Sequence, residues 1–498
     1  MPGRSWVSSW LPAAAMGSVA AAAAGGVDLG WYPPRHTSVN DLATALRGTG
    51  VYGFIFNSSH TPDAEYGTYN WCNMPHVRRT EYVRPAGGYE LRYVEVIQRH
   101  HKRTPYASNA FPVESYHWDC NDQGLYYYGA PFSAGDERHP APGFWQGFTS
   151  SVNPFVPAGW VGTCQFPQIT APGLDDSYVH GEDLYGVYHD LLGFLPSRGA
   201  RDWGRRVVYR VTQNVITSQV AGMLIGGTWY ASASTPLLIQ AAGIDSLEPQ
   251  YLCAVGSALF NAIKSPSDPT WQAHLDGAAG VYSVLDTISG VPPTDAGFHA
   301  SFDHYFDNLS ARQCHAKPLP CKLGTADASP PCVGQALADT VYRLGEWEYS
   351  YMYRDAPQSL AASVASYGVW IAELAAHLRA VVEGEEGPLY FHNVAHDGSV
   401  SRVLSILQID VMVWPGMGSE VVFELYQRAQ GSTTQGDASS PSGHYVRVLF
   451  GGRVLRSSNP SLGAIDMLPV ETLLAYFDGL VGRDASLVVG KCNGTVQI

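Results

Sequence analysis

Residues 91–109 read LRYVEVIQRHHKRTPYASN, and the fold class can be inferred from this stretch. The apolar run at 94–97 predicts a short buried strand that ends at Arg99. Pro105 restricts the backbone of the residue before it and suits the start of the next element. A strand that leads into a loop and a helix is typical of α/β proteins, in which reactive groups collect beyond the carboxyl ends of the strands.

Further strand-like stretches occur in two separate blocks of the sequence. RRVVYRVTQN lies in the first block, and PLYFHNVAHD, VVFELYQRA and HYVRVLF lie in the second. Between the blocks, apolar helical segments alternate with loops rich in Pro, Asp and Cys. This order predicts an α/β fold, a Rossmann-like mixed sheet flanked by helices, with a mostly helical cap inserted. We expect the core at 89–234 and 386–498, the cap at 235–385 and an additional excursion at 131–160.

The N-terminal residues have the composition of an exported protein. MPGRSWVSSWLPAAAMGSVAAAAAGG places a basic residue before a mildly apolar stretch and a run of alanines, which is the order of a secretory signal peptide. We expect this signal at 1–24, with a floppy alanine-rich terminus as the alternative. Residues 25–88 are rich in Gly, Tyr, Asn and Pro, and predict an irregular segment that wraps the surface of the core.

The cysteines also favour export to the extracellular space. There are eight, an even number, and none forms a CxxC pair, so disulfides are a better interpretation than a zinc ribbon. Cys314, Cys321 and Cys332 suggest a stapled loop, although the pairing cannot be deduced from sequence. N-glycosylation sequons occur at Asn57, Asn308 and Asn493. Together these features predict a secreted, disulfide-bonded glycoprotein.

The charge limits the possible partners. The chain has 30 Lys and Arg against 44 Asp and Glu, which gives a formal net charge of −14. A net acidic chain is poorly suited to non-specific binding of nucleic acid or of anionic membranes. After the N-terminus, no stretch offers the roughly 20 uninterrupted apolar residues of a membrane helix. A small anionic ligand remains compatible, because a local cationic pocket can lie within an acidic protein.

Two clusters of residues have the side chains that phosphate ester hydrolysis requires. Arg99 and Arg103 flank His100 at the expected exit of a strand, and guanidinium groups match the oxygens of a phosphoryl group. His396 and Asp397 follow another expected strand, so they should lie at the same edge of the sheet. This set supplies a nucleophile, cationic groups and an acid. A solvated basic turn and a structural His–Asp pair are the alternative interpretations.

The same residues resemble a known family, the histidine acid phosphatases, whose clade includes phytases and lysosomal-type acid phosphatases. The family signature R-H-G-x-R-x-P corresponds to RHHKRTP at 99–105, and its late H-D pair corresponds to His396 and Asp397. Its R-S-T segment corresponds to Arg210, Val211 and Thr212. The resemblance spans about residues 90–460 in the same order, and secreted fungal members look most similar.

The resemblance implies a role for each matched residue. His100 would attack phosphorus and form a phosphohistidine, and Asp397 would protonate the leaving oxygen. Arg99, Arg103, Arg210 and His396 would hold the phosphoryl oxygens. A water would then cleave the intermediate. No metal or other cofactor is expected, since the cationic groups supply the positive charge, and activity should favour acidic pH.

Some features depart from the family pattern and leave alternatives open. His101 stands where the family has Gly, and its bulkier side chain could point away or narrow the pocket. A non-catalytic or repurposed relative that binds an anionic small molecule is the alternative function. Zinc binding by the histidines with Asp397 is disfavoured by the neighbouring cations. The aromatic cluster EWEYSYMYRD at 346–355 predicts packing, with pocket lining as its alternative. Phytate would require a strongly cationic pocket, so a general phosphomonoesterase is favoured.

Overall fold

The described part of the chain covers most of the expected core and cap. The computed structural model describes residues 26–51, 69–113, 117–122, 125–127, 143–148, 150, 152–156, 162–200, 203–230, 235–324, 329–429 and 440–497. The predicted signal peptide at 1–24 and the sequon at Asn57 lie outside these ranges, as do residues 131–142 of the predicted excursion.

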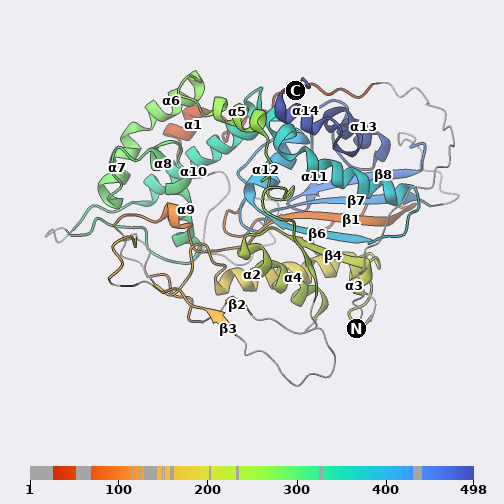
Figure 1. The fold of residues 1–498 in the computed structure, drawn as a ribbon, viewed down its shortest axis with the longest axis horizontal. Helices are drawn as coiled ribbons and strands as arrows, with labels where there is room; N and C mark the ends of the chain where they lie inside the picture. The colour runs from red at the N-terminus through yellow and green to blue at the C-terminus, as the bar shows by residue number, and fades with distance from the viewer. Residues whose placement is uncertain are drawn as a thin grey trace, which may run out of the picture.

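An eight-stranded mixed sheet forms the centre of the molecule (Figure 1). Its strand order is β10-β8-β7-β1-β6-β4-β5, and β9 pairs with β8. The strands are β1 (Tyr89–Arg99), β4 (Val207–Val211), β5 (Leu237–Leu238), β6 (Tyr390–Ala395), β7 (Glu420–Arg428), β8 (His444–Phe450), β9 (Arg453–Val454) and β10 (Leu468–Pro469). β1, β6, β4 and β5 are parallel, whereas β7 is antiparallel to β1. The carboxyl ends of the four parallel strands therefore meet at one edge.

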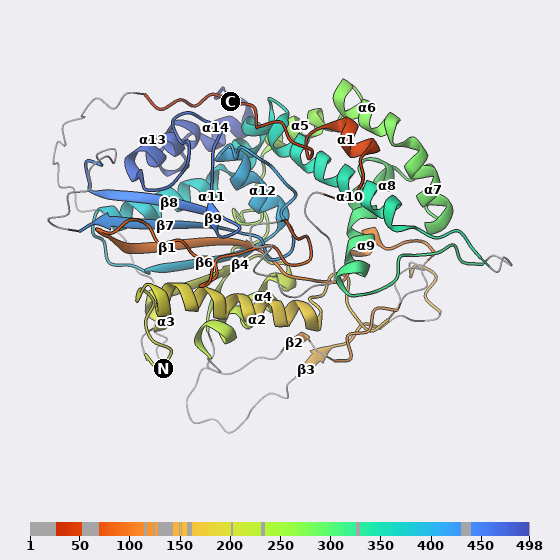
Figure 2. The same ribbon diagram turned by 180° about the vertical axis from the view of Figure 1, so that it is seen from behind.

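Helices cover both faces of this sheet. α2 (Ala171–Tyr185) and α4 (Val215–Trp229) lie side by side on one face. α11 (Ser359–Val382), α12 (Asp397–Ile406) and α13 (Val470–Val481) lie on the other, as Figure 2 also shows. Because both faces are covered, β6 and most of β7 are buried along their length, including polar residues such as His392 and Glu424. The predicted mixed α/β sheet flanked by helices is confirmed.

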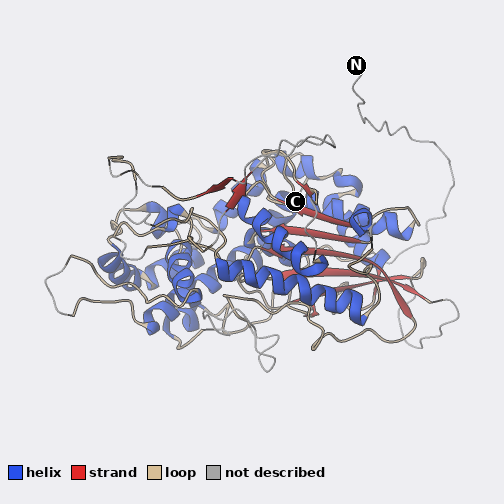
Figure 3. Ribbon diagram, turned by 90° about the horizontal axis from the view of Figure 1, so that it is seen from below, coloured by secondary structure: helices blue, strands red, loops and turns tan. Residues whose placement is uncertain are grey.

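A second group of helices lies beyond one end of the strands (Figure 2 and Figure 3). It comprises α6 (Pro269–Gly277), α7 (Ala279–Ser289), α8 (Ala296–His299), α9 (Asp303–Cys314) and α10 (Gln335–Ser350). α5 (Ala254–Ile263) also falls in the range predicted for the cap, but it packs on α11. An aromatic cluster that includes Trp71, Phe306 and Trp414 packs these helices against the core. α11 falls within the range predicted for the cap, 235–385, but it contacts β1, α12 and α13 and so belongs to the core layer.

α11 is also long and apolar enough to cross a membrane by length and composition alone. However, 72% of its most apolar window is buried inside the molecule, where it contacts α5, α13 and α14 (Val488–Asn493). These contacts account for its apolar composition, because a helix that is hydrophobic on most sides is expected when it is enclosed by other elements.

The N-terminal segment contacts both parts, and its residues 69–77 are buried, not laid on the surface as the sequence predicted. Within 26–51 and 69–88, the one α-helix is α1 (Leu42–Arg47), which packs against α10. Elsewhere the segment pairs with distant backbone, because the Arg35 N–H donates to the carbonyl of Asp410 at 2.8 Å. The remaining short elements are α3 (Trp203–Arg206), β2 (Leu125–Tyr127) and β3 (Gly143–Trp145). Short 3-10 or π turns occupy Ala107–Asn109, Gly186–Leu191, Tyr351–Asp355 and Arg483–Ala485.

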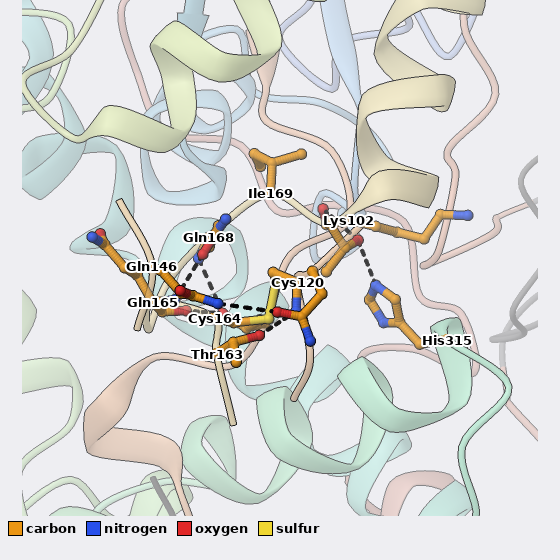
Figure 4. Close-up of a disulfide and its surroundings, with 12 residues drawn as sticks. Lys102, Cys120, Gln146, Thr163, Cys164, Gln165, Gln168, Ile169 and His315 are labelled. Atoms are coloured by element: carbon orange, nitrogen blue, oxygen red, sulfur yellow. Dashed lines mark hydrogen bonds between the residues drawn. A yellow bond between two sulfur atoms is a disulfide. The ribbon is translucent and has the colours of Figure 1, made fainter. Parts of the chain in front are cut away.

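All eight cysteines form disulfides. The pairs are Cys72–Cys314, Cys120–Cys164, Cys253–Cys492 and Cys321–Cys332. The last pair closes a loop, as the sequence suggested, but Cys314 joins the N-terminal segment and not that loop. Figure 4 shows the Cys120–Cys164 pair, beside which the backbone N–H of Cys120 donates to the Thr163 hydroxyl at 2.9 Å. Four disulfides are compatible with an extracellular location.

The predicted glycosylation site at Asn308 is wrong for the folded chain. Asn308 lies inside α9 with 2% of its surface exposed. Its amide donates to the carbonyl of Asn109 at 3.0 Å and accepts from Arg312 at 3.1 Å. A glycan would have to replace these buried contacts. Asn493 is exposed at the end of α14, so the sequon there stays a prediction.

Candidate active site

Two neighbouring strands bring the two sequence clusters together. In the parallel β1–β6 pair, Arg99 lies opposite Ala395, the last residue of β6. The backbone N–H of His100 then donates to the carbonyl of Ala395 at 3.1 Å. The imidazole rings of His100 and His396 consequently lie 5.5 Å apart between centroids. Segments about 300 positions apart thus converge where the two strands end.

The convergence forms the floor of a cavity of about 350 Å³. From the core, its lining includes Arg99, His100, Arg103, His396, Asp397 and Arg402. The region predicted as the cap contributes Glu248, Asp303, His304, Asp307 and Tyr349. Because the core residues lie at the carboxyl ends of parallel strands, the cavity occupies the usual ligand position of an open α/β sheet.

The loop that holds His100 is hydrogen-bonded to a disulfide-bonded segment outside the cavity. The backbone N–H of Thr104 donates to the carbonyl of Gln168 at 3.0 Å, and the Thr104 hydroxyl donates to the carbonyl of Gln165 at 2.9 Å. Gln165 follows Cys164 directly, and Figure 4 shows both glutamines beside the Cys120–Cys164 bond. This loop is therefore held in place by contacts outside the cavity.

The geometry leaves one nitrogen of His100 free to attack. Its Nδ1 lies 3.0 Å from the carbonyl oxygen of His101, which can only accept, so Nδ1 carries the proton in this contact. The lone pair of the neutral ring is then on Nε2. Burial, Arg103, Arg99 and His396 together hold the pKa of His100 well below its usual value. The site therefore favours the uncharged form of the His100 imidazole.

The two arginines of the floor are positioned by carboxylates and aromatic rings. Arg99 is 3.2 Å from the Oδ2 atom of Asp397, and its guanidinium lies 4.5 Å from the ring centre of Trp71. Arg103 donates to Asp307 at 3.0 Å and lies over the ring of Tyr106 at 4.3 Å. These contacts fix the positions of both cations at the floor of the cavity.

His396 and Asp397 differ in the form that the site favours. Burial and the charges of Arg103 and Arg99 outweigh the attraction of Asp397 and lower the pKa of His396 to about 4. For Asp397, burial raises the pKa, but Arg99, the Trp414 indole and the Arg103 charge outweigh it and lower the pKa below its usual value. In the ligand-free protein His396 is thus neutral and Asp397 is a carboxylate.

The predicted role of Arg210 is wrong. Arg210 lies within β4, and its side chain points to the α11 face, where it donates to Glu373 at 2.7 Å and to Ser246 at 2.8 Å. Side chains alternate between the faces of a strand, so a residue inside β4 cannot also point beyond its end. Thr212, which follows the end of β4, contacts a cavity residue instead, because its hydroxyl lies 3.0 Å from Nε2 of His396.

His101 does not narrow the cavity. Its side chain is fully buried and points away from His100, with Nε2 3.1 Å from Nδ1 of His180. His180 in turn is 3.0 Å from Glu420 of β7. Gly418, at φ 73°, makes room for the ring, because a Cβ there would lie 2.4 Å from it. The two adjacent histidines therefore do not converge, and no group of three potential metal ligands occurs among the described residues.

Several cavity residues were not identified from the sequence. Trp414 donates from Nε1 to Asp397 at 2.9 Å, and it lies in the segment before β7. Tyr349, within the aromatic cluster expected to pack, stacks on Trp414 at 3.8 Å and also lines the cavity. Asp303 and Asp307 are spaced i, i+4, so one helix face carries both, and that spacing was the available signal.

Comparison with known proteins supports the fold. The sequence matches no protein-family model and no curated protein sequence. Hafnia alvei phytase is structurally similar, with a TM-score of 0.51 and 10% identity over 81% of this chain and 99% of that one. A phytase from Klebsiella sp. ASR1 gives 0.46, with 14% identity over 80% and 97%. A multiple inositol polyphosphate phosphatase from Bifidobacterium longum gives 0.43, with 13% identity over 82% and 93%. The chain thus has the fold of the Hafnia alvei enzyme, as the resemblance to histidine acid phosphatases implied.

Proposed function

We propose that the chain hydrolyses phosphate monoesters through a covalent phosphohistidine. The observation that carries this proposal is the cavity where His100 and Asp397 lie together with Arg99 and Arg103, at the ends of adjacent parallel strands. A nucleophile, two cations and a carboxyl group around one cavity are the groups that this reaction requires. An acidic protein of this kind can still attract an anion locally.

In the first half-reaction, Nε2 of His100 attacks phosphorus and the bond to the leaving oxygen breaks. Arg99 and Arg103 hold the phosphoryl oxygens, and neutral His396 donates a further hydrogen bond from its ring. Asp397 is assigned as the proton donor. The dianion would draw Arg99 toward itself, which would weaken the interaction that keeps Asp397 ionised, so the carboxyl could take up a proton.

In the second half-reaction, a water molecule attacks the phosphohistidine. A nearby carboxylate accepts a proton from the water, and the bond between phosphorus and Nε2 breaks. Phosphate leaves and His100 returns to its neutral form. The positive charge for both steps comes from arginine, which cannot lose its proton in proteins.

The substrate class that fits the cavity is a small monoester with a single phosphate. Its lining carries three arginines, Arg99, Arg103 and Arg402, and also four carboxyl groups. The region predicted as the cap supplies three of those carboxyls, and none of its described lining residues is Lys or Arg. A leaving group that carries further phosphates would meet the Glu248 carboxyl and no cation among the described lining residues of this region, so phytate is a less suitable substrate than a general phosphomonoester.

The test is hydrolysis of p-nitrophenyl phosphate at acidic pH in the presence of EDTA. We expect turnover by the unaltered protein and loss of about 10³-fold or more in kcat for His100→Ala. His189→Ala changes a histidine that does not line the cavity and is the matched control. A labelled acid-labile phosphoenzyme should be trapped by rapid quenching. Equal turnover by His100→Ala and the unaltered protein would refute the assignment of His100 as the nucleophile. An unaltered protein that binds phosphate but does not hydrolyse the ester would indicate a non-catalytic relative.

A further inference from the structure

Asp303 is a carboxyl group of the cavity that the mechanism above does not use. It is the first residue of α9 and lines the same cavity as His100 and Asp397. Among the described residues, no donor lies within hydrogen-bonding distance of its side chain. Asp307, one helical turn later, accepts instead from Arg103, Tyr106 and Asn109. Asp303 is therefore free to interact with a ligand.

Asp397, in contrast, already accepts from three N–H groups. Its Oδ1 atom accepts from the backbone of Gly398 at 2.7 Å. Its Oδ2 atom accepts from Trp414 at 2.9 Å and lies 3.2 Å from Arg99. Donors of this kind stabilise the charged carboxylate, and they leave little room for a proton on the same oxygens. In the ligand-free cavity Asp397 is therefore a carboxylate, and it can donate a proton only after a bound dianion has drawn Arg99 away from it.

The surroundings of Asp303 favour the opposite form. Burial is the largest effect, and the carboxyls of Asp307, Asp397 and Glu348 add to it, whereas Arg103 alone opposes them. Together they raise the pKa of Asp303 to about 7. His304, the adjacent cavity residue, has a pKa lowered by burial against the opposing charges of Asp307 and Asp295, which disfavours a compensating positive charge there. Below neutral pH Asp303 therefore carries a proton.

We propose that Asp303 is a second catalytic acid of this site, which protonates the leaving oxygen of unactivated phosphate esters while Asp397 is held as a carboxylate. This inference rests on the proposed function. When His100 attacks, the electron pair of the breaking P–O bond goes to the leaving oxygen, and that oxygen takes the proton of Asp303. The water that attacks the phosphohistidine gives its proton to the Asp397 carboxylate, and exchange with solvent then restores the acid form of Asp303 and the ionised form of Asp397.

The test compares two substrates with Asp303→Asn. p-Nitrophenolate leaves without a proton, whereas the alkoxide from glycerol 2-phosphate needs one. With glycerol 2-phosphate at pH 6, we expect kcat to fall by about 10²-fold, which is typical for loss of a general acid. With p-nitrophenyl phosphate, kcat should stay within about twofold, because the first step does not use the acid. Asp303→Glu should restore part of the lost activity on glycerol 2-phosphate.

The pH profile gives a readout that a structural role would not change. The acid form of Asp303 is needed, so activity on the alkyl ester should be present at low pH and decline as pH rises through the pKa of Asp303. In Asp303→Asn that decline should move to lower pH, because the remaining acid, Asp397, has a lowered pKa. Asp268→Asn, at the N-cap of α6, is the matched control, since Asn also caps helices and Asp268 does not line the cavity.

Two outcomes would overturn the inference. One is an equal loss of kcat on both esters. The other is an unchanged decline of activity with pH in Asp303→Asn. If Asp303→Asn did not fold, Asp303→Ser would be measured in the same way, with folding checked by circular dichroism. Failure of the proposed function is distinguishable, because the unaltered protein would then hydrolyse neither ester.

Discussion

The indole Nε1 of Trp414 donates a 2.9 Å hydrogen bond to Oδ2 of Asp397. Trp414 lies in the core segment before β7, and its ring stacks on Tyr349 of α10 at 3.8 Å with the planes 11° apart. The carboxyl group of the core is thus oriented by an aromatic pair that spans core and cap. A shift of α10 would be transmitted to Asp397 through this stack.

Trp414→Phe should change how Asp397 titrates. The substitution keeps an aromatic ring for Tyr349 but removes a donor that lowers the pKa of Asp397. We expect the inflection of the pH–rate profile that belongs to Asp397 to move to higher pH. A hydrogen bond to a charged group contributes about 1.5–3 kcal/mol, which corresponds to a shift of about one to two pH units.

Trp271→Phe is the control for this measurement. Its indole N–H has no hydrogen-bond partner among the described residues, and the side chain is fully buried in the cap. Trp271→Phe should lower the melting temperature and leave the inflections of the pH–rate profile unchanged. A profile that is the same for Trp414→Phe and the parent would show that the indole does not set the state of Asp397.

Arg210→Gln and Arg103→Gln should differ in which property they change. Arg103 lines the cavity, so Arg103→Gln should reduce kcat/KM for p-nitrophenyl phosphate by about 10²-fold. Arg210 is buried away from the cavity beside Glu373 and Asp245, so its loss removes the positive charge that pairs with both carboxyl groups. We expect Arg210→Gln to keep kcat/KM within about threefold and to lower stability by about 1–3 kcal/mol in urea unfolding. A large loss of phosphate affinity in Arg210→Gln would instead favour the role implied by the resemblance.

His101 and Gly418 should be energetically coupled. Gly418→Ala would place a Cβ 2.4 Å from the His101 ring, at a φ of 73° that side chains rarely adopt. The clash with His101 should disappear in the double variant with His101→Gly, whereas the backbone strain should remain. In a double-mutant cycle by urea unfolding, we expect a coupling energy of about 1–3 kcal/mol. Additive effects would mean that the ring can move away at little cost.

The sequence predicted what depends on strand order and missed what depends on the direction of side chains. Adjacent parallel strands made the meeting of His100 and Asp397 predictable, because their carboxyl ends share one edge. The direction of the Arg210 side chain was mispredicted. Alternation along a strand decides which face each side chain occupies, and the exact end of β4 was not known. The direction of His101 depends on space left by Gly418, more than 300 positions later, which no local pattern shows.

The choice between phytate and simple monoesters should follow the charge of the cavity wall. Glu248, Asp303 and Asp307 all come from the region predicted as the cap. We expect kcat/KM for phytate to be lower than for glycerol 2-phosphate by about 10-fold or more, as one to two unfavourable charge contacts would produce. Glu248→Gln should bring kcat/KM for phytate closer to that for glycerol 2-phosphate. Glu385→Gln, outside the cavity, is the control. A higher kcat/KM for phytate in the unaltered protein would refute this substrate class.

Glu346 should make stability depend on pH above neutrality. It is 1% exposed, and burial raises its pKa to about 8, against the effects of Tyr69, the Trp414 backbone and Arg99. A carboxyl whose pKa is raised in the folded state stabilises the fold fully below its unfolded pKa and loses that contribution as pH rises through the folded pKa. Between roughly pH 4.5 and 8, this group alone should reduce stability by up to about 1.4 kcal/mol per pH unit. In Glu346→Gln, urea unfolding between pH 6 and 8 should show a smaller decline with pH than the parent shows. An equal decline in both proteins would mean that another group causes the loss of stability with pH, because Gln cannot ionise at any of these pH values.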